Sequence, residues 1–81
     1  DKYTRVLQDG FISRTMATNL VVIKTVSGMA MAVAVALDAM DIPGMMGCIA
    51  GDDTIFCAIH SEAETVKVME IIDKVIAKRH P

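Results

Sequence analysis

Apolar runs bounded by turn-forming residues divide this chain of 81 residues into short segments. Four of the runs are rich in β-branched residues or loosely alternate apolar with polar positions, a pattern typical of β-strands. They cover residues 11–16, 20–25, 45–50 and 54–59. The first two strands are predicted to form one hairpin and the last two another. Residues 3–8 are compatible with either a short helical turn or an arm.

A longer run over residues 29–40 predicts a helix. Its positions alternate between Ala30 and Ala36 as they would in a strand, but its length and its content of Ala and Met favour a helix. Ser27 is a suitable N-cap, and the turn signals of residues 41–44 end the segment. This helix is apolar around nearly all of its circumference. We therefore expect one face to pack on the sheet and the other to contact a second subunit.

Ser61 begins a second helix, because Glu64 follows three residues later in the arrangement of a capping box. The apolar positions of this helix form one broad stripe for packing across a sheet, namely Val66, Met69, Ile72, Val75 and Ile76. The order of elements is therefore β-β-α-β-β-α. It predicts an α+β fold, a two-layer sandwich in which a four-stranded sheet carries two helices on one face, formed as a single domain by residues 1–81.

Hydrophobic residues make up 53% of the chain, although it contains only two Phe, one Tyr and no Trp. A chain of this length buries only about 60% of the surface that its unfolded form exposes. One small core cannot cover this much apolar material. We therefore expect a homo-oligomer that buries the surplus between subunits.

The formal net charge is −2, from 8 basic and 10 acidic residues. This balance lacks the clustered positive field that grips a nucleic-acid backbone, so direct DNA contact is not expected of this segment. The one basic cluster, Lys74, Lys78, Arg79 and His80, falls at the end of the second predicted helix, where cations favour the helix dipole. The longest uncharged apolar run, residues 26–37, is shorter than the ~18 residues that a membrane span needs, so no membrane partner is expected.

Cys48 and Cys57 both fall in predicted strands and lack the spacing of metal ligands. We interpret them as free thiols of a reducing compartment, the cytoplasm, although strand pairing could bring them close together. No residue is placed to orient His60 as a base beside Cys48, and no glycine-rich phosphate loop appears. The sequence therefore predicts neither an enzyme nor a cofactor.

The segment Gly51-Asp52-Asp53 stands between the third and fourth predicted strands. Gly and Asp are ordinary turn residues, because Gly takes a positive φ freely and Asp bonds to its own backbone. Two adjacent carboxylates at a hairpin tip also repel each other and favour a neighbouring cation. That cation could be a metal ion, a Lys or Arg side chain or a small cationic ligand, and the residues alone also leave a solvated turn open.

Residues 47–56 read Gly-Cys-Ile-Ala-Gly-Asp-Asp-Thr-Ile-Phe and resemble the signature of the C-terminal domain of bacterial arginine repressors. Further matches fall at the family's spacings along most of the chain, at residues 20–25, Gly28, Leu37-Asp38 and residues 45–47. The resemblance implies a domain that assembles into hexamers, as two stacked trimers, and binds free L-arginine as co-repressor where the trimers meet. It also implies that DNA is read by a separate winged-helix domain, which precedes this one in the family and is absent from these 81 residues.

The resemblance implies that Asp52 and Asp53 hold the cationic groups of L-arginine, because guanidinium is a planar fork that a carboxylate meets bidentately. We also expect the backbone of Ala50 and Gly51 to contribute contacts to the ligand. A carboxylate cluster at an assembly interface repels itself when it is empty, whereas arginine neutralises it and favours the assembled form. The resemblance therefore implies that arginine concentration is linked to DNA affinity.

Three positions depart from the family pattern. Met31 stands where the family often has Gln, Cys48 stands where it usually has Thr, and Ser27 replaces a Pro before the helix glycine. The residues at positions 31 and 48 line the arginine pocket in the family. Met31 cannot hydrogen-bond a charged group as Gln does, a loss of about 1.5–3 kcal/mol. The departures keep open a domain that only assembles, as a partner of another repressor, and an unrelated enzyme or metal-binding module is the third alternative.

Overall fold

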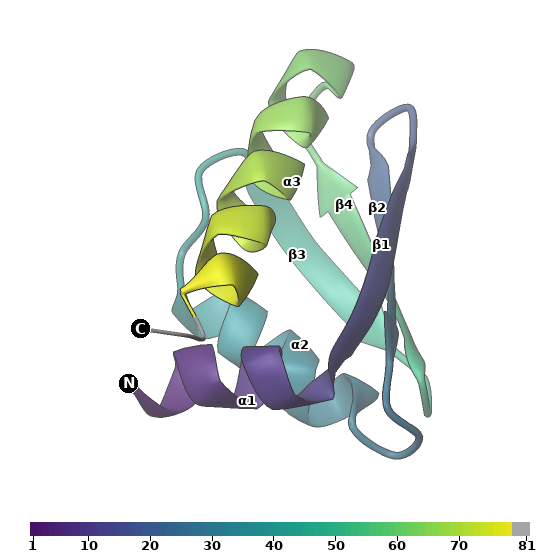
Figure 1. Cartoon of the computed structure of the whole chain (residues 1–81). Coiled ribbons are helices and arrows are strands. Elements are labelled where there is room, and N and C mark those ends of the chain that lie inside the picture. Colours follow the sequence, from purple (N-terminus) through teal and green to yellow (C-terminus); the bar gives the residue numbers. More distant parts are fainter. Residues whose placement is uncertain (79–81) are drawn as a thin grey trace.

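The computed structural model describes residues 1–78 of the chain. Its elements are α1 (Lys2–Gly10), β1 (Phe11–Ala17), β2 (Leu20–Thr25), α2 (Ala30–Ala39), β3 (Met45–Ala50), β4 (Thr54–Ile59) and α3 (Glu62–Ala77). The four strands form an antiparallel sheet in the order β1-β2-β4-β3 (Figure 1). The predicted α+β fold and its four-stranded sheet are confirmed, but residues 1–78 form three helices rather than two.

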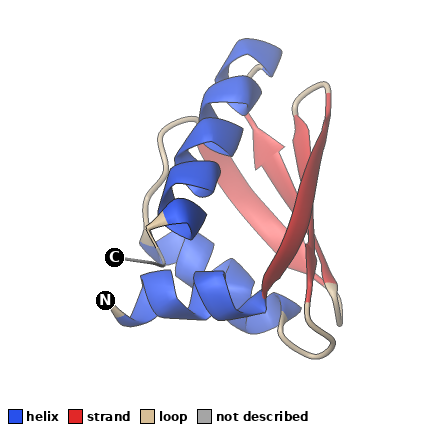
Figure 2. Cartoon of the chain, in the orientation of Figure 1, coloured by secondary structure: helices blue, strands red, loops and turns tan. Residues whose placement is uncertain are grey.

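The described helices pack on one face of the sheet, which leaves two layers (Figure 2). Alternate residues of β2 and β4 point into the layer between sheet and helices, and those with no exposed surface are Val21, Ile23, Ile55, Cys57 and Ile59. The helices complete one continuous core with Leu7, Val33, Leu37, Val68 and Ile72. This alternation is the period-2 pattern of a sheet with a single covered face.

Helix α1 is the element that the apolar pattern predicted only as a short turn or an arm. Asp1 caps it, because its carboxylate accepts a hydrogen bond from the Thr4 amide at 2.8 Å. Leu7 is its one fully buried large side chain, and the helix packs mainly against α2. A helix with so few apolar positions is stabilised by that tertiary contact rather than by its own periodicity.

Helix α2 begins later than predicted, and Ser27 is not its N-cap. Met29 occupies the cap position and makes no side-chain capping bond. The Ser27 hydroxyl instead donates to the Asp52 carboxylate at 3.2 Å, so it joins the loop before α2 to the β3–β4 turn. As expected of an apolar helix, α2 covers the sheet with one face and exposes the other, where Met31 is 69% and Val35 58% exposed.

Helix α3 begins as predicted. The Ser61 hydroxyl accepts a hydrogen bond from the Glu64 amide at 3.2 Å and donates to the Glu64 carboxylate at 2.9 Å, so the Glu64 side chain bonds the cap's hydroxyl rather than its amide. The buried stripe is rotated from the predicted one, because Thr65 and Val68 are buried whereas Val66 is exposed.

Two further features concern the helices as a group. In the part of the chain that the structure describes, no helix is both long and apolar enough to cross a membrane. The predicted basic cluster begins with Lys74 in the last turn of α3 and Lys78 at its C-cap, and its members Arg79 and His80 lie outside the described residues.

Candidate ligand-binding site

The β3–β4 hairpin closes through a two-residue turn made of Asp52 and Asp53. The Gly51 amide donates to the Thr54 carbonyl at 2.8 Å, which is the last backbone bond before the turn. The sequence suggested that Gly51 would supply a positive φ, but neither Gly51 nor the two aspartates adopts one. A Cβ at Gly51 would also meet only ordinary contact, with the Thr54 carbonyl at 3.8 Å. The fold therefore does not require glycine at this position.

Backbone hydrogen bonds fix the turn to the segment between β2 and α2. The Asp52 carbonyl accepts from the Ala30 amide at 3.2 Å, and the Asp53 carbonyl accepts from the Thr25 amide at 2.8 Å. These bonds use an amide at the start of α2 and one at the end of β2. They place the two carboxylates at the corner where the sheet, the turn and α2 meet.

The two aspartate side chains have different partners. Asp52 accepts from Ser27, whereas Asp53 accepts from the Thr54 hydroxyl at 2.9 Å. The Lys24 ammonium donates to the same hydroxyl at 2.8 Å, so its charge lies one residue away from Asp53 without pairing with it. Within residues 1–78, no Lys or Arg nitrogen lies within ion-pair distance of Asp52 or Asp53. Both side chains are exposed, and each has carboxylate oxygen capacity left for a cationic ligand.

A shallow pocket of about 260 Å³ lies between α2 and β3. Its lining residues are Met31, Ala34, Val35, Asp38, Cys48, Ile49 and Ala50. It brings together three of the predicted site residues, Met31, Cys48 and Ala50. Gly51 lines a neighbouring hollow of about 320 Å³ together with Ala50 and Thr54, and the aspartates of the turn line neither space.

Asp38 is the lining residue that sequence reasoning did not select. It is the one charged side chain of this pocket and is exposed on α2. A lone carboxylate on an otherwise apolar helix was the available signal, since such a helix has no structural need for a charge. Asp38 gives the pocket a group that can bind an ammonium or guanidinium ion.

The Cys48 thiol lies beside Asp38, with its sulfur 3.4 Å from a carboxylate oxygen. Burial, together with the negative charge of Asp38, raises the pKa of Cys48 to about 11. Burial likewise raises the pKa of Cys57 to about 12, with Cys48 as the next cause. Both thiols are therefore protonated at neutral pH, and Cys48 presents an S–H donor to Asp38.

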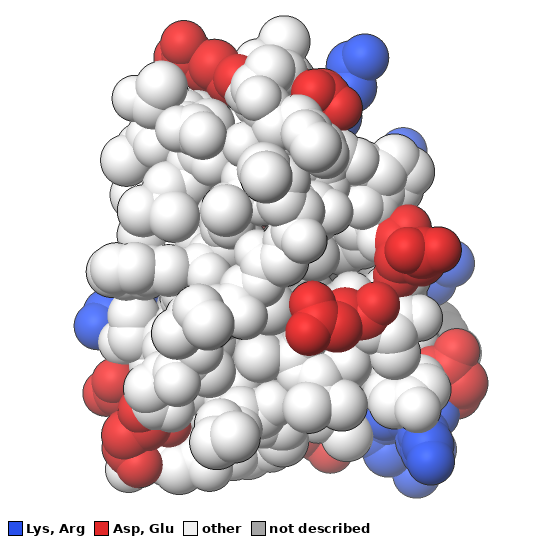
Figure 3. All heavy atoms as spheres, turned by 180° about the vertical axis from the view of Figure 1, so that it is seen from behind, with Lys and Arg blue, Asp and Glu red and all other residues white. Residues whose placement is uncertain are grey.

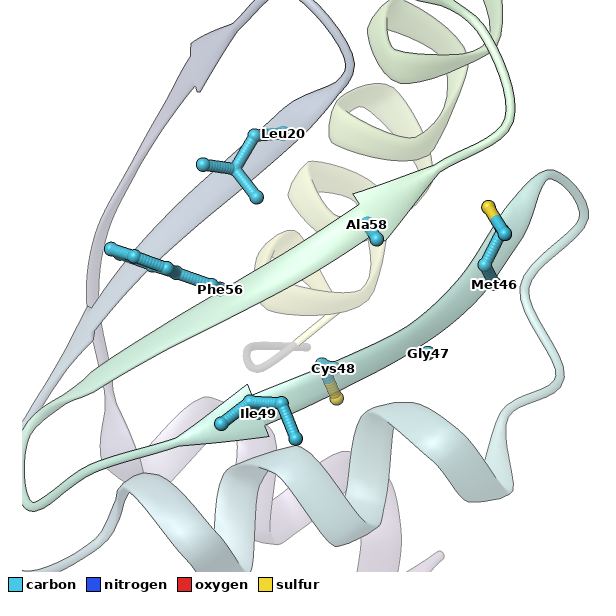
Figure 4. A pocket seen from close by; sticks show the side chains of 7 residues that line it. All are labelled: Leu20, Met46, Gly47, Cys48, Ile49, Phe56 and Ala58. Atoms are coloured by element: carbon cyan, nitrogen blue, oxygen red, sulfur yellow. The ribbon is translucent and has the colours of Figure 1, made fainter.

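The outer face of the sheet carries a broad apolar hollow of about 660 Å³. Its lining residues are Leu20, Met46, Gly47, Cys48, Ile49, Phe56 and Ala58. Figure 4 shows Leu20 and Phe56 on adjacent strands at one side of this hollow, and Cys48 with its sulfur toward α2. Seen from behind, the molecule presents mainly uncharged residues, with acidic groups in separate clusters (Figure 3). Ile49 is 79% exposed and Phe56 53%, an unusual degree for large apolar side chains.

No group of three or more His, Cys, Asp or Glu side chains within residues 1–78 is arranged to hold a metal ion. Among these described residues, no third acidic or imidazole side chain is grouped with Asp52 and Asp53.

Comparisons with known proteins match a part of the chain that includes the residues of this site. The family described as "Arginine repressor, C-terminal domain" matches residues 7–74. An arginine repressor of Lachnoclostridium phytofermentans is 60% identical over 76 residues, which are 94% of this chain and 50% of that protein. The corresponding proteins of Lachnospira eligens and Bacillus pumilus are 51% and 40% identical, over 94% and 88% of this chain. The chain spans about half the length of these relatives.

Proposed function

Because this chain belongs to the arginine repressor family, as its C-terminal domain, we propose that it senses L-arginine and assembles the regulator of which it is part. Arginine binds between copies of the chain and stabilises a hexamer of two trimers. The remaining half of such a regulator contacts the DNA. The domain acts by binding and assembly in the cytoplasm, with no catalytic step and no cofactor besides L-arginine.

The observation that carries this proposal is the separation between the pocket and the carboxylates within one chain. Met31, Cys48, Ala50 and Asp38 surround the pocket, whereas Asp52 and Asp53 project from the turn beyond it. A ligand with two cationic ends can join the pocket of one copy to the turn of another. Binding and assembly then favour each other, because the complete site exists only between subunits.

The exposed apolar surface supports the assembly part of the proposal. The outer sheet face presents Phe56 and Ile49, and the free face of α2 presents Met31 and Val35. These are two separate surfaces, one on the sheet and one on a helix. Two kinds of subunit contact match an assembly in which trimers form first and then stack. The α2 surface borders the pocket, so we place the contact between trimers there.

Each proposed ligand contact has a chemical role. The free carboxylate oxygens of Asp52 and Asp53 accept hydrogen bonds from the guanidinium or ammonium group of the ligand. Asp38 offers a further acidic group within the pocket. The backbone of Ala50 offers an amide and a carbonyl, and Gly51 offers its carbonyl, since its amide already donates to the Thr54 carbonyl. Met31 packs against the aliphatic stem of the ligand, since its thioether cannot replace the hydrogen bonds of Gln.

The solution mass of this chain tests the proposal, measured by light scattering on a sizing column with and without millimolar L-arginine. We expect a mass of about three chains that moves toward six with L-arginine and stays unchanged with lysine or citrulline. Calorimetry on the same samples gives the arginine affinity. A monomer under both conditions would contradict the proposal.

An assembly-only domain is the second candidate, and the apolar character of Met31 in the pocket favours it. An assembly-only domain would form a stable oligomer whose mass does not change with arginine and whose calorimetric titration shows no arginine binding. The Met31→Gln variant separates the two candidates. If arginine sensing is present, Met31→Gln tightens binding by at least about tenfold, because one added hydrogen bond to a charged group contributes about 1.5–3 kcal/mol. If it is absent, the variant remains as unresponsive as the parent.

A further inference from the structure

Cys48 and Cys57 face each other across β3 and β4. They are direct register partners, and the pairing can be counted back from the turn. Gly51 and Thr54 form a hydrogen-bonded pair, so Ile49 with Phe56 is the next such pair and Cys48 with Cys57 falls at a non-hydrogen-bonded position. Opposed residues at such positions have Cα atoms about 4.5 Å apart, which lies within the range that a disulfide spans.

The two thiols have unequal access to solvent. Cys57 is fully buried in the core, whereas Cys48 is partly exposed and lines both the pocket beside α2 and the hollow of the outer sheet face. Both thiols are free. A reagent from solvent therefore meets Cys48 first, with Cys57 directly behind it as the only described cysteine that could respond.

We propose that Cys48 and Cys57 form an oxidisable pair, which a peroxide converts into a disulfide between β3 and β4 within one chain. The small fraction of Cys48 that is thiolate attacks one peroxide oxygen, so the rate should rise as the pH approaches the raised pKa of Cys48. The O–O bond breaks, and Cys48 becomes a sulfenic acid as one water leaves. The Cys57 sulfur then displaces the sulfenic oxygen as a second water and forms the S–S bond. Two thiols are oxidised and one hydrogen peroxide is reduced to two waters.

The disulfide changes the pocket beside α2. In the reduced chain the Cys48 S–H group lies 3.4 Å from the Asp38 carboxylate, and in the disulfide that hydrogen is gone. Asp38 loses a neighbour that can donate to it, and the Cys48 sulfur is held toward β4. This consequence rests on the proposed function, under which the same pocket holds L-arginine. Bound arginine then covers Cys48 and slows its oxidation.

The experiment exposes the chain to hydrogen peroxide, denatures it, alkylates the remaining thiols and measures intact mass and cysteine-containing peptides. We expect the loss of two hydrogens, a linked Cys48–Cys57 peptide and no alkylation until a reductant is added. The matched variant Cys48→Thr removes the exposed thiol and should leave Cys57 fully alkylated after denaturation. Further oxygen atoms on Cys48 with Cys57 still free, or disulfides between chains, would overturn the proposal.

A second arm repeats the oxidation with saturating L-arginine, and with citrulline as control. We expect arginine to slow disulfide formation several-fold and citrulline to leave it unchanged. Equal rates with arginine shown to be bound by calorimetry would overturn the link between the cysteine pair and the pocket. If calorimetry finds no arginine binding but the disulfide forms, the cysteine pair is supported while the proposed function fails.

Discussion

The two faces of the sheet use similar apolar residues in opposite ways. On the inner face, Ile55 is fully buried by the helices, and its neighbour Phe56 on the outer face is 53% exposed. No described side-chain polar atom is left buried without a partner on the covered side. The inner face is thus complete within one chain, whereas the outer face carries apolar surface of the kind that subunit contacts bury. The comparison separates what the chain needs to fold from what it needs to assemble.

Truncation of a core residue should have the largest effect on folding. Ile55→Ala removes a fully buried side chain from the centre of the sheet and should lower the free energy of unfolding by about 2–5 kcal/mol. Urea denaturation followed by circular dichroism, at one fixed protein concentration, measures this loss. A loss below about 1 kcal/mol would show that the inner face tolerates a cavity and would break the distinction between the faces.

The neighbouring position should respond in the opposite way. Phe56→Ser leaves the inner core intact but removes the largest exposed side chain of the outer face, so we expect the chain to fold and its assembly to weaken. A central aromatic contact contributes about 2 kcal/mol or more to an interface. Sedimentation over a range of concentrations should show smaller species than the parent. An unchanged mass would place the subunit contact elsewhere, with Val35→Ser on α2 as the next variant to measure.

The sequence predicted the strands and α3 better than it predicted α1 and the start of α2. The strands and α3 follow from β-branched runs and from the Ser61 cap, because local preference and burial agree there. Helix α1 was not predicted in full, since a single fully buried large side chain, Leu7, gives no readable period. Ser27 is a residue type that often caps a helix, but its hydroxyl donates to Asp52, a partner that is distant in the sequence.

The candidate site could be predicted in its residues but not in its layout. The adjacent carboxylates of Asp52 and Asp53 and the family signature selected the turn. The pocket, however, depends on how α2 packs against β3, which no local pattern encodes, and Asp38 joins it only through that packing. The roles of the site residues remain a prediction, because under the proposed function a second subunit completes the site.

The turn offers a test that leaves both faces of the sheet unchanged. Asp53→Asn keeps the size of the side chain and its acceptor for Thr54 but removes the charge, so the fold should be unaffected. We expect arginine affinity to fall by about 1.5–3 kcal/mol, since a hydrogen bond between charged groups is replaced by a weaker one. Calorimetry measures this change. Glu70→Gln on the exposed side of α3 is the matched control, and equal affinities for both variants would remove Asp53 from the site.

The smallest expected effect lies at the margin between the two faces, where Arg14 of β1 and Asp73 of α3 form a bidentate pair at 3.0 and 2.7 Å. The hydrogen bond from Arg14 lowers the pKa of Asp73 below its usual value of 3.8. The pair therefore stabilises the fold at pH values above 3.8, and its contribution is lost as the pH falls through the lower pKa of the folded state.

Solvent screens the exposed pair, so Asp73→Asn should lower the free energy of unfolding by only about 0.2–1 kcal/mol at pH 7. Urea titrations at pH 7 and pH 3 should show this difference shrinking at the lower pH. A cost that stays constant with pH would assign the role of Asp73 to packing rather than to its charge.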